Sequence, residues 1–103
     1  MRSATNSLAP PAYFVYILEC ADGTFYAGYT RDLQARLLLH NAGRGAKYMR
    51  GRGPARIVYS RGYQRLTSAL RAEIRLKKLT RPEKARLVAG YARRQRRITC
   101  RPA

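Results

Sequence analysis

The feature that most restricts the fold is the apolar, aromatic and β-branched run AYFVYILEC at residues 12–20, which is typical of a buried strand. Asp22-Gly23 follows almost directly, and an Asp-Gly pair favours the tight turn of a β-hairpin. The next segment, TFYAGY at residues 24–29, is predicted to return as the partner strand. We therefore expect the first 30 residues to form an antiparallel hairpin.

A helix is predicted next, with Thr30 as its N-cap and Asp32 in its first turn, where negative charge suits the helix dipole. Asn41-Ala42-Gly43 should end this helix, because glycine readily adopts left-handed backbone. The sequence ARIVYS at residues 55–60 then predicts a third strand.

Two further helices are predicted in the second half of the chain. The first begins at Thr67 or Ser68 and runs to about Leu79, with apolar residues at helical spacing. The sequence TRPE at residues 80–83 resembles a capping box and should open the second. These elements predict an α+β, sandwich-like fold in which a small three-stranded antiparallel sheet is flanked by about three helices.

A chain of 103 residues is predicted to form one domain. We expect a disordered leader at residues 1–11, a folded domain at residues 12–91 and a disordered basic tail at residues 92–103. No apolar run reaches the roughly 18–20 residues of a membrane span, and no N-terminal segment resembles a signal peptide. A cytoplasmic, bacterial-type location is expected, and association with the nucleoid is compatible with it.

The charge balance predicts a polyanionic partner. The chain has 22 Lys and Arg against five Asp and Glu, for a formal charge of +17. Nucleic acid is the first candidate and an anionic membrane surface the second. A glycine- and arginine-rich loop could follow a nucleic-acid backbone and stack a base. The residues expected to bind nucleic acid are Arg44, Lys47, Tyr48, Arg50, Arg52 and Lys77.

Glu73 is the only carboxylate between Leu33 and Pro82, a stretch with thirteen Lys and Arg, and it should stay ionised there. Two interpretations follow. Glu73 can form an i,i+4 ion pair with Lys77 on its helix, or it can be the place where a divalent cation binds.

Four other residues also have both a structural and a functional interpretation. Tyr16 and Tyr26 lie on paired strands, where cross-strand aromatic packing alone explains many tyrosines. Arg36 can be a solvated arginine, and His40, the only histidine, can be a structural residue beside an apolar face. Arg36 and His40 are one helical turn apart, so they can also face the same anion.

Taken in order, these residues resemble the GIY-YIG nuclease domain, over about residues 12–89. The first motif reads Val15-Tyr16-Ile17 and the second Tyr26-Ala27-Gly28, and Arg36 follows Tyr26 by ten residues. The chain is most similar to the short, single-domain bacterial YhbQ-like branch. The resemblance implies the GIY-YIG endonuclease fold.

The resemblance also implies roles for the five candidate catalytic residues. Tyr16 would act as general base, assisted by Tyr26 and His40, and positive neighbours would have to lower its pKa from the usual value near 10. Arg36 would bind the scissile phosphate. Glu73 would hold one Mg²⁺ or Mn²⁺ ion.

The expected function is that of a divalent-metal-dependent endonuclease acting on DNA, with single-stranded or branched DNA favoured, RNA also compatible, and DNA processing or repair as its setting. No membrane and no obligate protein partner are expected. The alternative is a non-catalytic nucleic-acid-binding module that uses the same basic surface. A membrane-surface protein would fit the charge but leave the tyrosines, Arg36 and Glu73 unexplained.

Overall fold

The computed structural model describes residues 10–43 and 54–99 and contains one three-stranded antiparallel sheet in the order β2-β1-β3. The predicted α+β fold with three helices is confirmed. In chain order the elements are β1 (Tyr13–Cys20), β2 (Phe25–Thr30), α2 (Leu33–Asn41), β3 (Ala55–Tyr63), α3 (Leu66–Lys78) and α4 (Arg81–Thr99).

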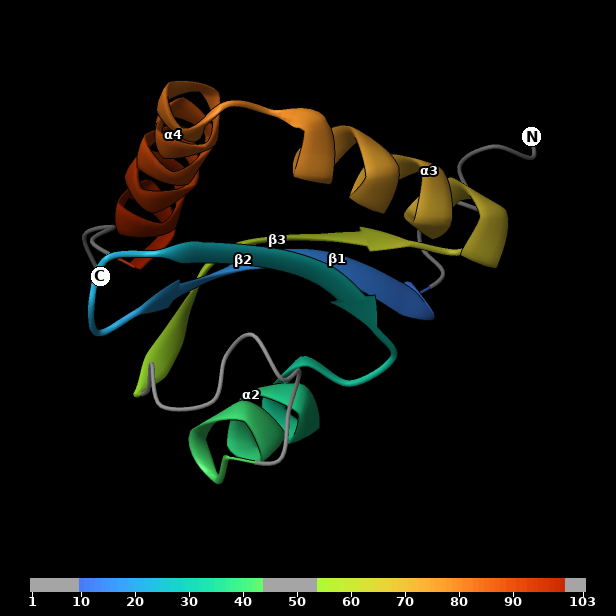
Figure 1. Cartoon of the computed structure of the whole chain (residues 1–103). Helices are drawn as coiled ribbons and strands as arrows, with labels where there is room; N and C mark the ends of the chain where they lie inside the picture. Colours follow the sequence, from blue (N-terminus) through green and yellow to red (C-terminus); the bar gives the residue numbers. More distant parts are fainter. Residues whose placement is uncertain (1–9, 44–53, 100–103) are drawn as a thin grey trace.

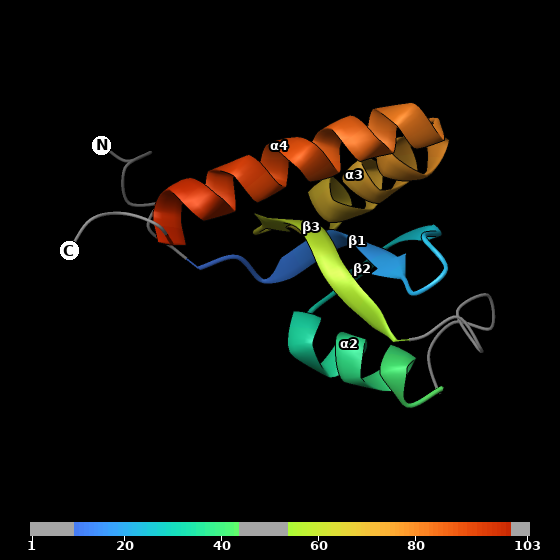
Figure 2. The ribbon, with the colours of Figure 1, turned by 90° about the vertical axis from the view of Figure 1, so that its left-hand side faces the viewer.

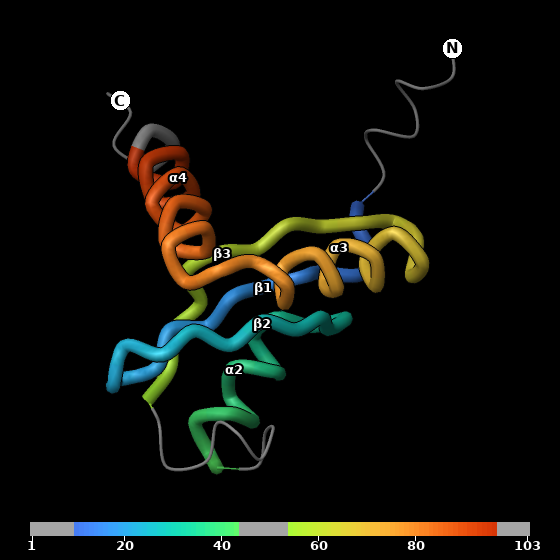
Figure 3. The backbone as a smooth tube through the Cα atoms, turned by 45° about the horizontal axis from the view of Figure 1, so that its top comes forward, coloured from blue at the N-terminus to red at the C-terminus, as the bar shows by residue number. Residues whose placement is uncertain are grey.

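The sheet lies between two helical layers. Helix α2 covers one face, and α3 and α4 cover the other (Figures 1 and 2). Because successive side chains of a strand point to opposite faces, Val15 and Ile17 of β1 pack towards α3, whereas Tyr16 and Leu18 pack towards α2. Strand β1 is also central in the sheet, as Figure 3 shows. Its burial on both faces explains why its sequence is apolar without interruption from Tyr13 to Leu18.

The hairpin forms at the predicted turn. The amide of Gly23 donates to the carbonyl of Cys20 at 2.8 Å, and Gly23 has a φ of 86°, which favours glycine. In the resulting register Tyr16 pairs with Gly28, and Leu18 pairs with Tyr26. Tyr16 and Tyr26 are therefore diagonal neighbours on the same face of the sheet.

The start of α2 differs from the prediction. Thr30 is still paired with Phe14 in the sheet, so it does not cap the helix. Asp32 is the N-cap instead, and its side chain accepts a hydrogen bond from the amide of Ala35 at 3.0 Å.

The capping box before α4 is present as predicted. The amide of Thr80 donates to Glu83 Oε1 at 2.8 Å, and the amide of Glu83 donates to Thr80 Oγ1 at 3.3 Å. These two reciprocal bonds satisfy donors that the first turn of a helix leaves without partners.

The predicted disordered tail is wrong for residues 92–99, because α4 continues to Thr99. This segment contains no proline, and its alanine, glutamine and arginines favour helix. Tyr91 anchors the helix, since its ring packs against Tyr59 with centroids 5.7 Å apart and its hydroxyl lies 3.1 Å from Ser60 Oγ. The rest of the predicted tail, and residues 1–9 of the leader, lie outside the described residues. Within the described ranges, no helix is long and apolar enough to cross a membrane.

Candidate active site

A cavity of about 510 Å³ lies at the free edge of β2. It draws side chains from both faces of the sheet, since Tyr16 and Tyr26 belong to the α2 side whereas Tyr13 and Tyr29 belong to the α3 side. The cavity therefore wraps around the edge of the sheet. Its lining residues are Tyr13, Tyr16, Tyr26, Gly28, Tyr29, Thr30, Arg31, Arg36, Leu66 and Glu73.

Four of the five predicted catalytic residues meet in this cavity, namely Tyr16, Tyr26, Arg36 and Glu73. They come from β1, β2, α2 and α3, so only the tertiary fold brings them together. The fifth, His40, does not line the cavity but packs edge-on against Tyr26, with ring centroids 5.5 Å apart.

Gly28 makes room for the Tyr16 ring. A Cβ atom added at Gly28 would lie 2.7 Å from Tyr16 Oη and 3.0 Å from Tyr16 Cζ. Gly28 sits inside β2, so it is a site of close approach within a strand and not a loop glycine. The phenol of Tyr16 therefore reaches the cavity across β2 only because residue 28 has no side chain.

The pKa of Tyr16 is raised to about 12 in this environment. Burial is the largest cause, because the Tyr16 side chain is only 2% exposed and the phenolate would lose its hydration. The neighbouring Tyr26 and Glu73 raise the pKa further, whereas Arg36 lowers it. In the protein alone, burial thus outweighs the positive neighbours, contrary to the expected lowering.

Arg36 sits at the start of α2, where its amide donates to the carbonyl of Asp32 at 3.0 Å. Its Nε atom is buried and has no hydrogen-bond partner among the residues that the structure describes. A buried guanidinium nitrogen without a hydrogen-bond partner destabilises the folded protein unless an acceptor reaches it. An anion entering the cavity that Arg36 lines would supply one.

His40 is the only buried residue of α2, with 4% of its surface exposed. Neither ring nitrogen has a hydrogen-bond partner within residues 10–43 and 54–99. Burial lowers the pKa of His40 below the usual 6.5, and the charge of Arg36 lowers it further. The imidazole is therefore neutral at pH 7 and carries one nitrogen that can accept a hydrogen bond.

Glu73 forms the predicted ion pair with Lys77 and also lines the cavity. Its Oε2 atom lies 3.5 Å from Lys77 Nζ in an i,i+4 pair, and its side chain is 18% exposed. It is the only acidic residue that lines the cavity. In the described part of the chain, no group of three or more His, Cys, Asp and Glu side chains could hold a metal ion. A cation bound here would have one protein carboxylate.

Several lining residues were not predicted. Arg31 lies over the ring of Tyr13, with its guanidinium carbon 5.5 Å from the ring centroid, and Tyr29 lines the same cavity. No sequence motif singles them out, although both flank the end of β2, which continues directly into α2. The predicted nucleic-acid-binding residues of the loop, Arg44, Lys47, Tyr48, Arg50 and Arg52, lie outside the described residues.

Comparison with known proteins identifies close relatives along most of the chain. A UPF0213 protein of Streptococcus pneumoniae is 46% identical over 71 residues, which cover 69% of this chain and 72% of that protein. A UPF0213 protein of Halobacterium salinarum is 47% identical over 75 residues, which cover 73% of this chain and 97% of that protein. These names specify no activity, metal or substrate.

Solved structures show the same fold. The solution NMR structure of a UPF0213 protein from Bacillus halodurans matches with a TM-score of 0.50 and 47% identity, covering 75% of this chain and 82% of that one. The solution NMR structure of a protein from E. faecalis matches with a TM-score of 0.54 and 36% identity, covering 78% and 85% of the two chains.

The model of the GIY-YIG catalytic domain matches residues 12–86. This segment contains all four candidate residues of the cavity as well as His40. A GIY-YIG domain implies nuclease-type activity, and hence a nucleic-acid substrate. Since the match spans most of the 103 residues, the chain belongs to the GIY-YIG family.

Proposed function

We propose that this protein is a divalent-metal-dependent endonuclease that hydrolyses DNA phosphodiester bonds, with single-stranded or branched DNA as its substrate in DNA processing or repair. One observation carries the proposal. A single cavity brings together Tyr16 and Tyr26, Arg36 with its unpartnered buried nitrogen, and the carboxylate of Glu73. Hydrolysis by an in-line attack of water needs a phosphate anchor, a cation ligand and a proton acceptor, and these residue types can supply all three.

The residues of the cavity fit one Mg²⁺ or Mn²⁺ ion. Glu73 offers carboxylate oxygens and has no acidic neighbour in the cavity. A magnesium ion is commonly bound by one or two carboxylates, several waters and a substrate phosphate, so a second acidic residue is not needed. Glu73 would hold the ion, and the ion would offset negative charge that develops on the leaving oxygen.

Arg36 is the proposed phosphate anchor. Its planar guanidinium suits the oxygens of a phosphate, and its Nε atom is buried without a protein acceptor. Arg36 lies in the first turns of a helix that Asp32 caps, so its backbone is fixed before substrate binds. Preorganised donors stabilise charge in a transition state more than mobile ones do.

Tyr16 is the proposed proton acceptor, with Tyr26 and His40 assisting. At a pKa of about 12 the phenol is protonated at pH 7, so in the free protein Tyr16 is not yet able to accept a proton. Glu73 is one of the causes that raise this pKa, and Arg36 lowers it. Neutralising Glu73 would therefore shift Tyr16 towards the useful range. The neutral His40 ring, packed against Tyr26, would hold that tyrosine in place.

The proposed preference for strandedness or structure rests on the kind of contacts available. The net charge of +17 and exposed cations such as Lys77 provide phosphate contacts, which position a protein on nucleic acid but carry no sequence information. If about six phosphates are neutralised, affinity should fall roughly a thousandfold between about 50 and 200 mM salt.

A second candidate function is a nucleic-acid-binding module without catalysis. The raised pKa of Tyr16 favours it, because a phenol with a pKa of about 12 is a poor base unless its surroundings change. Such a module would have no use for a carboxylate in a cavity that binds polyanions, since Glu73 repels phosphate.

The test is a cleavage panel with single-stranded, duplex, flap and junction DNA plus RNA, in Mg²⁺ and Mn²⁺. Glu73→Ala should abolish cleavage while binding at low salt is kept. Arg36→Ala should reduce cleavage by about 100-fold or more. Glu19→Ala and Arg56→Ala are the matched controls for loss of one acidic and one basic side chain. These two residues form an ion pair with each other at 2.8 Å and do not line the cavity.

Persistent cleavage by Glu73→Ala would remove Glu73 as the metal ligand. Loss of the circular-dichroism signature in Arg36→Ala would instead support a structural role for that residue. A wild-type protein that binds DNA but cuts nothing in either metal would favour the binding module.

A further inference from the structure

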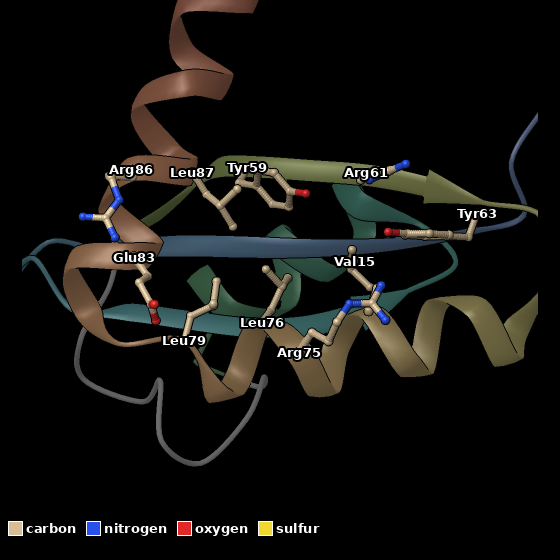
Figure 4. A pocket seen from close by; sticks show the side chains of 11 residues that line it. Val15, Tyr59, Arg61, Tyr63, Arg75, Leu76, Leu79, Glu83, Arg86 and Leu87 are labelled. Atoms are coloured by element: carbon tan, nitrogen blue, oxygen red, sulfur yellow. The ribbon is translucent and has the colours of Figure 1, made fainter.

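A second cavity, of about 490 Å³, lies between β3, α3 and the start of α4 (Figure 4). It shares no lining residue with the cavity of Glu73. Helix α3 forms a wall of both, with Glu73 facing one cavity and Arg75 facing the other. Side chains two residues apart on a helix point about 200° away from each other, so Glu73 and Arg75 can line cavities on opposite sides of α3.

The floor of this cavity is apolar. Val15, Ala72 and Leu76 belong to the main core cluster and yet line the cavity, and Leu79 and Leu87 complete the apolar part. Figure 4 shows Leu76 of α3, Leu79 of the α3–α4 connection and Leu87 of α4 together with Val15 of the sheet. Val15, Ala72 and Leu76 are already buried, so a ligand with an apolar face would mainly cover the half-buried Leu79 and Leu87.

The remaining lining residues are aromatic or charged. Arg61, Arg75 and Arg86 are exposed and line the cavity together with Tyr59 and Tyr63. The guanidinium of Arg61 lies over the Tyr63 ring, 5.4 Å from its centroid. Figure 4 shows the three arginines coming from β3, α3 and α4, so they surround the apolar residues from different elements.

Glu83 also lines this cavity but does not neutralise it. Its carboxylate accepts the amide of Thr80, and the hydrogen bonds to Thr80 lower the pKa of Glu83, so it stays ionised at pH 7. Three arginines against one glutamate leave two uncompensated positive charges.

The chain has no spare carboxylate for these arginines. Of its five acidic residues, Glu19 pairs with Arg56, Glu73 pairs with Lys77, and Asp22 bonds to Thr24. Asp32 and Glu83 cap helices. Residues 1–9, 44–53 and 100–103 contain no acidic residue at all. An anion that binds these arginines is therefore not an acidic side chain of this protein.

We propose that this cavity binds a nucleoside phosphate, either as a free nucleotide or as the end of a nucleic-acid strand. The base would cover the apolar floor beside Tyr59 and Tyr63, and the phosphate would bind Arg75, because Arg86 lies at the other end of the cavity beside Glu83 (Figure 4). The volume lies within the range of about 300–1,000 Å³ that is usual for small-molecule sites. This proposal does not depend on catalysis at Glu73.

A neighbouring hollow supports the choice of ligand. It has a volume of about 520 Å³, shares Tyr59, Arg61 and Leu87 with the cavity, and adds Tyr91 and Arg94. Aromatic side chains alternating with arginines are the arrangement that binds successive nucleotides of a single strand. A strand end in the cavity could thus continue along β3 and α4.

The test is an NMR titration of the full chain, followed through the methyl signals of Val15, Leu76 and Leu87. The probes are adenosine 5′-monophosphate, adenosine, inorganic phosphate, decanoate and a 5′-phosphorylated pentanucleotide. Adenosine monophosphate should shift these methyls with saturation, and adenosine or phosphate alone should bind at least about tenfold more weakly. Arg75→Ala should weaken binding by about tenfold, and Arg86→Ala should have a smaller effect because Arg86 already interacts with Glu83.

Arg71→Ala is the matched control, because it removes an exposed arginine from the same helix outside both cavities. It should change the affinity by less than about twofold. Equal losses in Arg71→Ala and Arg75→Ala would reduce the effect to overall charge and overturn the proposal. So would binding of decanoate as tight as that of the nucleotide, or no saturable methyl shift with any nucleotide probe. Tighter binding of the pentanucleotide than of the mononucleotide would identify a strand end as the source, and the reverse would identify a free nucleotide.

Discussion

Replacing Gly28 with alanine is the sharpest test of how the site is built. The added Cβ would lie 2.7 Å from Tyr16 Oη and 3.0 Å from Tyr16 Cζ, well inside normal contact. Backbone strain is not the issue, since the only glycines with positive φ among the described residues are Gly23 and Gly43. The substitution therefore acts on the Tyr16 ring itself.

The expected magnitude follows from two opposing effects. Overfilling a packed site costs about 1–3 kcal/mol, whereas replacing glycine by alanine gains about 0.4–1 kcal/mol by restricting the unfolded chain. The difference is a net loss of up to about 2.6 kcal/mol in the free energy of unfolding, with a middle value of about 1.3 kcal/mol. Cleavage should fall by about 100-fold, because a shift of about 1 Å in a reacting group has that effect.

The assay is guanidinium denaturation of a double-mutant cycle with Tyr16→Phe. Removing the hydroxyl deletes the atom at 2.7 Å and leaves the ring carbon at 3.0 Å. Gly28→Ala should therefore cost less in the Tyr16→Phe background than in the wild type, by at least about 0.5 kcal/mol.

Gly90→Ala on α4 is the control, because it should raise the free energy of unfolding where Gly28→Ala should lower it. Its added Cβ would meet only Arg94 Nη1 at 3.7 Å and Arg93 Nη2 at 3.8 Å, the ends of flexible side chains. This variant should gain up to about 1 kcal/mol from helix propensity. The reasoning is refuted if the effects of Gly28→Ala and Tyr16→Phe are additive, or if Gly28→Ala is as stabilising as Gly90→Ala.

Three further outcomes are expected. Stability should fall as pH drops below about 6.5, because the pKa of His40 is lower in the folded chain than in the unfolded one, and denaturation across pH should show a smaller decline in His40→Phe. Thr80→Ala should cost about 1 kcal/mol in the same assay, and no change would mean that the capping box contributes nothing. In ¹³C-tyrosine NMR, Glu73→Gln should lower the pKa of Tyr16 from about 12 and Arg36→Ala should raise it, and shifts in the reverse directions would contradict the assigned causes.

Local signals in the sequence predicted the fold well where one short motif decides the geometry. The Asp-Gly turn and the capping box at residues 80–83 both form as expected, because each needs only a few neighbouring residues. The prediction that Thr30 caps α2 was wrong, because the local sequence does not show that Thr30 pairs with Phe14 in the sheet. The basic end of α4 was missed because arginines give no apolar period, although they favour helix.

Residue types at the site were predictable, but their environments were not. The resemblance to the GIY-YIG domain, carried by order and spacing, predicted roles for Tyr16, Tyr26, Arg36 and Glu73, and these four residues line one cavity. The raised pKa of Tyr16 depends on burial, and burial is set by tertiary packing that one sequence does not reveal. The sequence placed Gly28 in a strand but did not show why it lacks a side chain, because the Tyr16 ring that it accommodates lies on another strand.

The two interpretations of Glu73 turn out not to exclude each other. Its pair with Lys77 joins a carboxylate to a lysine that is 53% exposed, at 3.5 Å, and such i,i+4 pairs contribute only about 0.2–0.5 kcal/mol. A contact that weak would not keep a doubly charged cation from the carboxylate, particularly when a phosphate bound by Arg36 adds a further oxygen ligand. Lys77 would then be released beside the cavity, where a positive charge favours a polyanion. The ion pair therefore balances Glu73 in a chain of +17 without removing it from the site where a nuclease would need it.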